Sequence, residues 1–191
     1  MEYVILLIST VLINNIVLAK FLGICPFLGV SKSSSTALGM GVAVIFVMTI
    51  STVFTWLVYT YLLLPLDLSY LQTVTYILVI AFLVQVVEIV MKKVSPELYQ
   101  ALGVYLPLIT TNCTILGVAI LVVQNDFNLL RSVVFAIGNS VGFTLAIVIF
   151  SSIREQMDVA EGIPAWMKGT PAALITAGIL AMAFMGFAGL V

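Results

Sequence analysis

The sequence predicts an all-α integral membrane protein with six transmembrane helices, and three observations support this fold class. Apolar residues make up 63% of the 191 residues, whereas charged residues make up 8%. Soluble domains carry roughly 25% charged residues, so a soluble fold of this composition would expose large apolar patches and aggregate. The apolar residues also fall into long runs, and a run of about 20 residues suffices to span the hydrocarbon core as a helix.

Six segments meet this length requirement: 3–24, 37–63, 70–91, 99–123, 130–152 and 171–190. The breaks between them contain the polar or helix-breaking residues Pro65, Asp67, Lys92, Lys93, Ser95, Pro96, Glu97, Gln124, Asn125 and Asp126. The longest polar loop runs from Arg154 to Pro171. All other breaks are short, so we expect a single polytopic membrane domain over residues 1–191.

The distribution of lysine and arginine predicts the orientation, because cytoplasmic loops of membrane proteins are enriched in these residues. Arg131 alone lies on the side of the even-numbered loops. The loops after the first, third and fifth segments hold or border Lys20, Lys32, Lys92, Lys93, Arg154 and Lys168. We therefore expect both termini on the non-cytoplasmic side of the membrane.

A short motif occurs twice and predicts an internal repeat. The pattern Cys-x-x-Leu-Gly-Val begins at Cys25 and again at Cys113, in or beside the first segment of each three-segment half. The halves cover about 1–91 and 92–191. Because three spans is an odd number, the second half must enter the bilayer from the opposite side, which makes an inverted 3+3 repeat.

Both cysteine motifs contain residues that interrupt helices. Gly23 and Pro26 flank the first cysteine, and Pro107 and Asn112 precede the second. We therefore expect the first and fourth helices to be broken. Broken helices at the bilayer midplane are where inverted-repeat proteins place their binding sites. If the two cysteines act together, the pseudo-two-fold axis requires them to meet near the bilayer centre.

The residues alone leave three interpretations of Cys25 and Cys113 open. Free cysteines often serve as small buried apolar side chains, and a disulfide would need an oxidising setting. Thiolates also ligate iron–sulfur clusters, which usually take four cysteines. Since the chain has only two, a cluster would need two more from a homodimer partner or a homologous protein in the same complex.

Other functions can be weighed from the remaining polar residues. The chain has no histidine and a net charge of −1, which excludes histidine chemistry and a basic nucleic-acid-binding face. Glu88 could relay ions, or pair with Lys92 one helical turn later. Six further side chains could coordinate a cation or bond between helices: Asn14, Asn15, Asn112, Asn139, Ser140 and Thr144. The alternatives are therefore a secondary transporter, an ion channel and a purely structural membrane component.

Several stretches resemble a known family over essentially the whole chain. They are residues 14–15, 20–23, 25–32, 106–113, 153–155 and 174–178, and they resemble the A-type membrane component of the Rnf electron-transport complexes. The E-type component of the sodium-pumping NADH:quinone reductases is closely similar. Pro26 and Gly29, after the first cysteine, favour the Rnf branch.

The resemblance implies a membrane component of an ion-translocating oxidoreductase. In that family the complex couples electron flow between ferredoxin and NAD to sodium or proton translocation. The A-type and E-type components have opposite orientations, and each contributes two cysteines to one shared iron–sulfur cluster, expected to be of the [2Fe–2S] type. Carried over to this chain, the ligands are Cys25 and Cys113. The resemblance also implies further partners, the B-, C-, D- and G-type components, which carry flavins and other iron–sulfur clusters.

Overall fold

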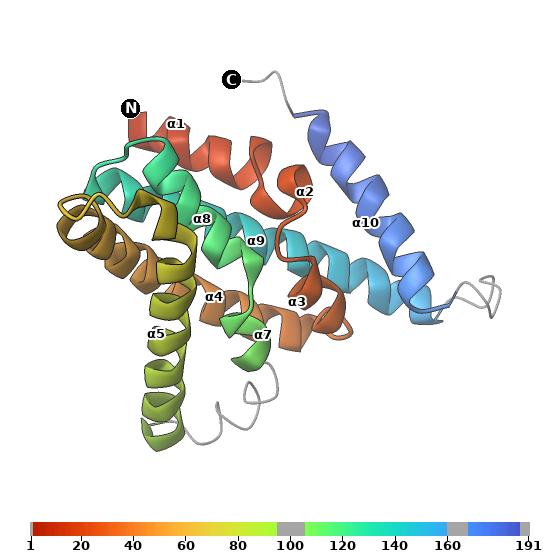
Figure 1. Ribbon diagram of the computed structural model, residues 1–191. Coiled ribbons are helices and arrows are strands. Elements are labelled where there is room, and N and C mark those ends of the chain that lie inside the picture. The colour runs from red at the N-terminus through yellow and green to blue at the C-terminus, as the bar shows by residue number, and fades with distance from the viewer. Residues whose placement is uncertain (1, 95–105, 160–167, 188–191) are drawn as a thin grey trace.

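The computed structural model describes residues 2–94, 106–159 and 168–187, and these residues form helices joined by short turns, without strands (Figure 1). The α-helices are α1 (Glu2–Ile8), α2 (Ile16–Lys20), α3 (Ile24–Gly29), α4 (Ser34–Val58), α5 (Gln72–Val94), α7 (Leu106–Thr110), α8 (Cys113–Gln124), α9 (Leu129–Val159) and α10 (Thr170–Met185). Two π-helical turns, Ser9–Ile13 and Tyr59–Leu63, extend α1 and α4. The prediction of an all-α chain is confirmed for the described residues.

Four of the described helical segments are long and apolar enough to cross a membrane. They are Ser34–Leu63, Gln72–Val90, Pro107–Gln124 and Leu129–Val159, and they match the predicted second to fifth segments. The two outer segments are shorter, because Glu2–Ile13 and Thr170–Met185 are apolar helices of fewer than 18 residues. The described helices therefore support a multi-pass membrane protein, and the count of six spans stays a prediction.

The predicted first span, 3–24, is divided into several pieces. The helix ends after the π-helical turn Ser9–Ile13, and α2 follows it directly. A second break separates α2 from α3, because Phe21 and Gly23 both adopt left-handed backbone conformations. The expected interruption of the first helix is confirmed, and the sequence did not indicate that it would occur twice.

The fourth predicted segment is also interrupted. Residues 99–105 of that segment lie outside the described residues, and the break falls between α7 and α8 at Thr111–Asn112. In each half a short helix precedes a break, and the helix after the break carries the cysteine near its start. This order matches the inverted repeat, which itself stays a prediction.

The longest helices, α4 and α9, form the most extensive helix contact and cross the middle of the molecule (Figure 1). Gly41 on α4 faces the side chain of Thr144 on α9 so closely that a Cβ atom there would lie 2.8 Å from the threonine Oγ1. Met48 on α4 and Phe143 and Phe150 on α9 are fully buried. Small residues let helix backbones approach closely in membranes, and this contact is the scaffold for the cysteine motifs.

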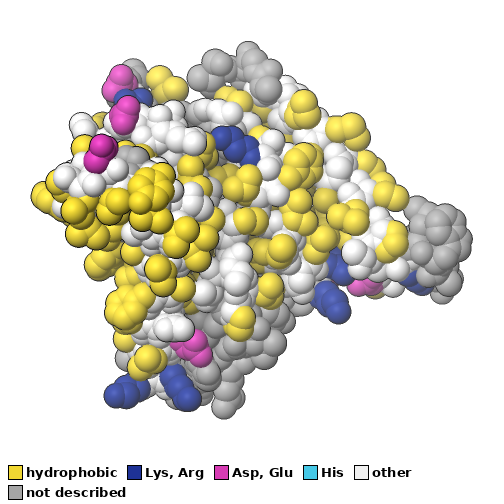
Figure 2. All heavy atoms as spheres, in the orientation of Figure 1, with side chains coloured by type: hydrophobic (Ala, Val, Ile, Leu, Met, Phe, Trp, Pro, Cys, Tyr) yellow, Lys and Arg dark blue, Asp and Glu magenta, His cyan; other side chains and the backbone are white. Residues whose placement is uncertain are grey.

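The outward faces of the helices are apolar, as a lipid-facing surface requires. Figure 2 shows hydrophobic side chains spread over the visible surface, with several charged groups gathered at its edges. On α5 the exposed hydrophobic side chains include Ile77, Leu78, Phe82 and Ile89. Burial of these residues therefore depends on lipid or on neighbouring proteins of a complex.

Two of the cations used to predict the orientation lie near each other in the fold. Lys20 and Arg131, which the sequence assigned to opposite sides, line the same cavity. The first predicted segment is interrupted at Asn14–Asn15, before Lys20. The orientation of the chain in the membrane stays a prediction.

Candidate metal centre

A buried asparagine, Asn15, stabilises the break before α2. Asn15 is 1% exposed, and its Oδ1 accepts hydrogen bonds from the backbone N–H groups of Val17 and Leu18, which caps α2. Its Nδ2 donates to the carbonyl oxygens of Val11 (3.1 Å) and Gly142 (2.8 Å). The amide thus satisfies four backbone groups that a helix break would leave unpaired, and it anchors the break to α9.

The turn between α2 and α3 requires a glycine. Gly23 has φ +82°, a conformation that side chains with a Cβ rarely adopt. A Cβ atom at this position would also overlap Oγ1 of Thr114 and lie 3.2 Å from Oδ1 of Asn112. Cys25 follows as the second residue of α3, and its side chain is exposed.

The second motif begins at an N-cap. Asn112 precedes α8, and its Oδ1 accepts a hydrogen bond from the backbone N–H of Thr114 at 3.0 Å. Cys113 is the first residue of α8, and its side chain is exposed. The start of a helix favours negative charge, because its first N–H groups lack helical partners and the helix dipole is positive there. Cys113 lies at this end of α8.

The two motifs meet. The backbone N–H of Gly23 donates a hydrogen bond to the Sγ atom of Cys113, with a nitrogen–sulfur distance of 2.8 Å. Cys25 follows Gly23 by two residues, which is at most about 7 Å of extended chain. Both cysteines are free, so the disulfide interpretation is not realised here. Both are also exposed, which argues against the interpretation as buried apolar side chains.

Helix α9 packs against the first motif at two places. Phe143 lies against Gly23, and Phe150 stacks on Phe27 of α3 with ring centroids 4.3 Å apart. Phe27 lies two residues after Cys25. The side chains of α9 therefore fix the position of α3 from both sides of the cysteine.

The C-terminal part of α9 also contacts the end of α3 and the start of α4. Arg154 donates from Nη1 to the carbonyl oxygen of Leu28 (2.7 Å) and to Oγ of Ser31 (3.0 Å). The Glu155 carboxylate accepts hydrogen bonds from the backbone N–H and the hydroxyl of Ser34, which begins α4. The pair thus ties the end of α3 and the start of α4 to one turn of α9. Sequence reasoning did not assign this role to the pair, although two charged residues directly after an apolar span were a visible signal.

Two polar atoms beside the cysteines have no hydrogen-bond partner among the described residues. They are Nδ2 of Asn112 and Oγ1 of Thr114, on side chains that are 3% and 0% exposed. A buried donor without a partner costs about 1–3 kcal/mol. Asn112 and Thr114 flank Cys113 in the sequence, so the cysteine lies between two residues with unpaired polar atoms.

The other polar residues singled out in the sequence mostly bond within their own helix. Asn139 donates to the carbonyl of Phe135, and Thr144 donates to that of Ser140. Asn15, through its bond to Gly142, does make the expected bond to a distant helix. Glu88 is half-buried on α5, a helix that carries neither cysteine.

Comparisons with known proteins agree with the resemblance seen in the sequence. A family model described as Rnf-Nqr subunit, membrane protein, matches residues 3–191. The A-type component of the ion-translocating oxidoreductase complex of Syntrophotalea carbinolica is 57% identical over 97% of this chain and 96% of its own length. The A-type component of the Na⁺-translocating ferredoxin:NAD⁺ oxidoreductase complex of Acetobacterium woodii is 54% identical over 100% of this chain and 98% of its own length. The chain belongs to the Rnf-Nqr family of membrane proteins.

Proposed function

We propose that this chain is the A-type component of an ion-translocating ferredoxin:NAD oxidoreductase complex and that Cys25 and Cys113 hold half of an iron–sulfur cluster. The names of the relatives support the first part, since they describe the A-type component of such complexes. The contact between Gly23 N–H and Cys113 Sγ supports the second part, because it brings the two motifs together at the surface of the chain. In this proposal the protein lies in the bacterial inner membrane with both termini on the non-cytoplasmic side.

The donor set fits one half of a cluster. Both thiols are exposed, and the chain has no other cysteine. Clusters of the [2Fe–2S] type usually take four thiolates, so a second chain must supply two. The natural donor is the homologous E-type component, because the same repeat in opposite orientation would present a matching pair. Exposure of the thiols suits such sharing, since a ligand pair at a surface can be completed by a neighbour.

The residues of this chain would tune and position the ligands. The Gly23 N–H stabilises negative charge on the sulfur of Cys113, and hydrogen bonds to ligand sulfurs help to set the potential of such centres. The stack of Phe27 on Phe150 keeps Cys25 in a fixed place. A bound cluster would supply reversible one-electron exchange. Ligands near mid-depth would divide a span of about 30 Å into two steps of roughly 15 Å.

A secondary transporter or ion channel is the second candidate, and the interrupted helices favour it. Breaks such as those at Asn15 and Asn112 are typical of ion and substrate sites in transporters. That alternative requires ion or solute flux through this chain alone in vesicles, unaffected by cysteine replacement. A purely structural role would leave electron transfer intact when either cysteine is replaced.

The test uses the whole complex, purified without oxygen. We expect Cys25→Ser or Cys113→Ser to remove one cluster's iron and sulfide and its paramagnetic signal in the reduced state. Thr111→Ser, at an exposed residue near Cys113, is the matched control and should keep all three. A full iron count and an unchanged signal in both cysteine variants would defeat the proposal.

A further inference from the structure

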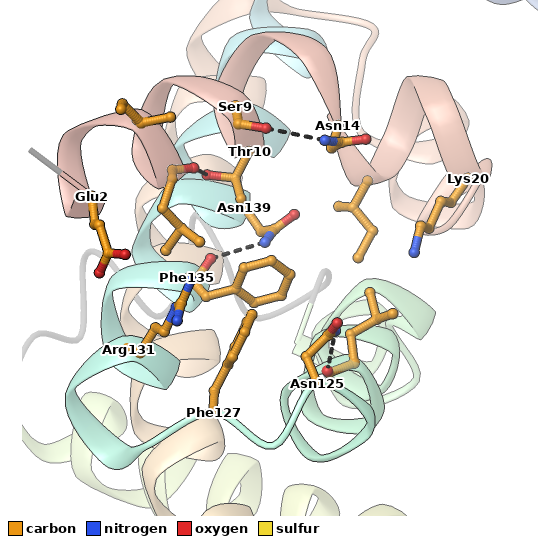
Figure 3. Close-up of a pocket in the computed structure, with 14 residues that line it drawn as sticks. Glu2, Ser9, Thr10, Asn14, Lys20, Asn125, Phe127, Arg131, Phe135 and Asn139 are labelled. Atoms are coloured by element: carbon orange, nitrogen blue, oxygen red, sulfur yellow. Dashed lines mark hydrogen bonds between the residues drawn. The ribbon is translucent and has the colours of Figure 1, made fainter. Parts of the chain in front are cut away.

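A cavity of about 480 Å³ lies between α1 with its π-helical turn, α2, the end of α8 and the start of α9 (Figure 3). Ligand pockets have volumes of roughly 300–1,000 Å³. The cavity is lined by neither cysteine. The cavity is therefore separate from the proposed cluster site. Its lining residues indicate which ligand could bind there.

The lining carries more positive than negative charge. Lys20 enters from α2 and Arg131 from α9 (Figure 3), against one carboxylate, Glu2. Among the described residues, no ion pair involves Lys20 or Arg131, and the Arg131 guanidinium lies 5.0 Å from the centre of the Phe127 ring. Two cations that face a cavity without a paired anion favour an anionic ligand.

Two amides in the lining present acceptor oxygens. Asn125 donates from Nδ2 to the carbonyl of Leu121 (2.7 Å), and Asn139 donates likewise to the carbonyl of Phe135 (2.9 Å). A carbonyl oxygen can only accept, so these contacts fix which end of each amide is the nitrogen. The Oδ1 atoms accept no hydrogen bond from any described side chain or backbone, and Asn139 is 2% exposed. A ligand with hydroxyl donors would satisfy both oxygens.

The remaining walls are apolar, and the cavity lies where helices end. The apolar lining consists of Ile5, Leu6, Ile16, Leu121, Phe127 and Phe135. The adjoining turn after α8 is held by Trp56, whose Nε1 donates to the carbonyl of Phe127 at 2.9 Å. Tryptophan is enriched at the level of lipid headgroups. The cavity thus combines cations, acceptors and an apolar surface, and a tryptophan of the kind enriched at headgroup level holds the adjoining turn.

We infer that this cavity binds an anionic phospholipid with a hydroxyl-bearing headgroup, of the phosphatidylglycerol class. Lys20 and Arg131 would neutralise the phosphate, and Asn125 and Asn139 would accept from the headgroup hydroxyls. The apolar walls would cover the first part of an acyl chain. Basic pockets between membrane helices are known to recognise anionic headgroups.

The test measures lipid binding to the delipidated whole complex by native mass spectrometry. Phosphatidylglycerol and phosphatidylcholine with the same acyl chains are compared, and Lys93→Gln, at an exposed lysine outside the cavity, is the control. We expect Lys20→Gln and Arg131→Gln each to weaken phosphatidylglycerol binding about fivefold, the effect of one basic residue near a charged headgroup. Phosphatidylcholine binding should change in neither variant.

Three results would overturn the inference. One is an equal weakening of phosphatidylglycerol and phosphatidylcholine binding in the lysine and arginine variants, which would mean that the headgroup is not recognised. Another is unchanged phosphatidylglycerol binding in these variants. The third is displacement of the lipid by inorganic phosphate at matched concentration, which would make the ligand a free anion. If the lysine and arginine variants fail to assemble, Asn125→Asp decides, because Asn125 is exposed. The added carboxylate should weaken the binding of phosphatidylglycerol but not that of phosphatidylcholine. An unchanged affinity for phosphatidylglycerol would contradict the inference.

Discussion

The backbone nitrogen of Gly23 lies 2.8 Å from the sulfur of Cys113, although 90 residues separate them in the chain. This contact joins the two Cys-x-x-Leu-Gly-Val motifs at the surface of the molecule. It depends on the left-handed conformation of Gly23, two residues before the first motif, and on the helix start at Cys113 in the second. Variants of the residues that build this part of the fold therefore have measurable effects on stability.

The first prediction concerns Gly23. We expect Gly23→Ala to destabilise the protein by at least about 1–2 kcal/mol, because a left-handed conformation costs that much with a Cβ, and the Cβ would also overlap Oγ1 of Thr114. The thermal unfolding midpoint of the solubilised complex measures this. Adding Thr114→Ala to this variant should restore the part of the stability that the overlap with Oγ1 removes. An unfolding midpoint that does not rise in the double variant would show that the overlap is unimportant.

The second prediction concerns the amide that holds the first break. Asn15→Leu removes the cap of α2 and both donors to backbone carbonyls, so we expect a loss of about 2–3 kcal/mol. Asn14→Leu is the matched control, because Asn14 is exposed and, within the described part of the chain, its side chain donates only to Ser9. Equal melting temperatures for the two variants would contradict the role assigned to Asn15.

The third prediction concerns the end of α9. Arg154→Gln removes the guanidinium that bonds to Leu28 and Ser31, and hydrogen bonds from charged donors contribute about 1.5–3 kcal/mol. We expect a lower unfolding midpoint, with Lys32→Gln, an exposed cation in the adjoining turn, as the unaffected control. Faster proteolysis between α3 and α4 in the arginine variant is a second readout. A midpoint equal to that of the control would show that Arg154 does not hold α3.

The fourth prediction compares two glycines in helices. Gly41→Ala places a Cβ 2.8 Å from Oγ1 of Thr144, and overpacking of this kind costs about 1–3 kcal/mol. At Gly178 on α10, nothing lies within 4 Å of the added atom, so alanine should stabilise by up to about 1 kcal/mol through helix propensity. Changes of the same sign in both variants would contradict the close α4–α9 contact.

Much of the fold was predictable from composition and hydropathy. The second and third segments correspond closely to α4 with its π-helical turn and to α5, because an uninterrupted apolar run long enough to span the bilayer has few alternatives to a helix. The fifth segment corresponds to α9, but this helix continues to Val159, into the predicted polar loop. The first segment is equally apolar, yet Asn15 and Gly23 divide it into pieces. Hydropathy alone does not detect such breaks, since one buried amide or glycine scarcely changes the average.

The site was predictable in part. The repeated motif indicated that Cys25 and Cys113 belong together, and the Gly23 contact gives that pairing a physical basis. The support from Phe150 and Arg154 was not foreseen, because it joins residues more than 120 positions apart through packing and a carbonyl contact. Nor was the cavity beside Lys20, because its lining comes from both sides of the break at Asn14–Asn15 and from the distant helices α8 and α9.

The most direct test of the central claim is a density map of the whole complex, prepared without oxygen, around the two cysteine sulfurs. The account predicts iron density that bridges Cys25 and Cys113 to two thiolates of a neighbouring homologous protein. Sulfurs of the assembled complex that face lipid with no metal between them, or that bind metal without a second chain, would contradict it.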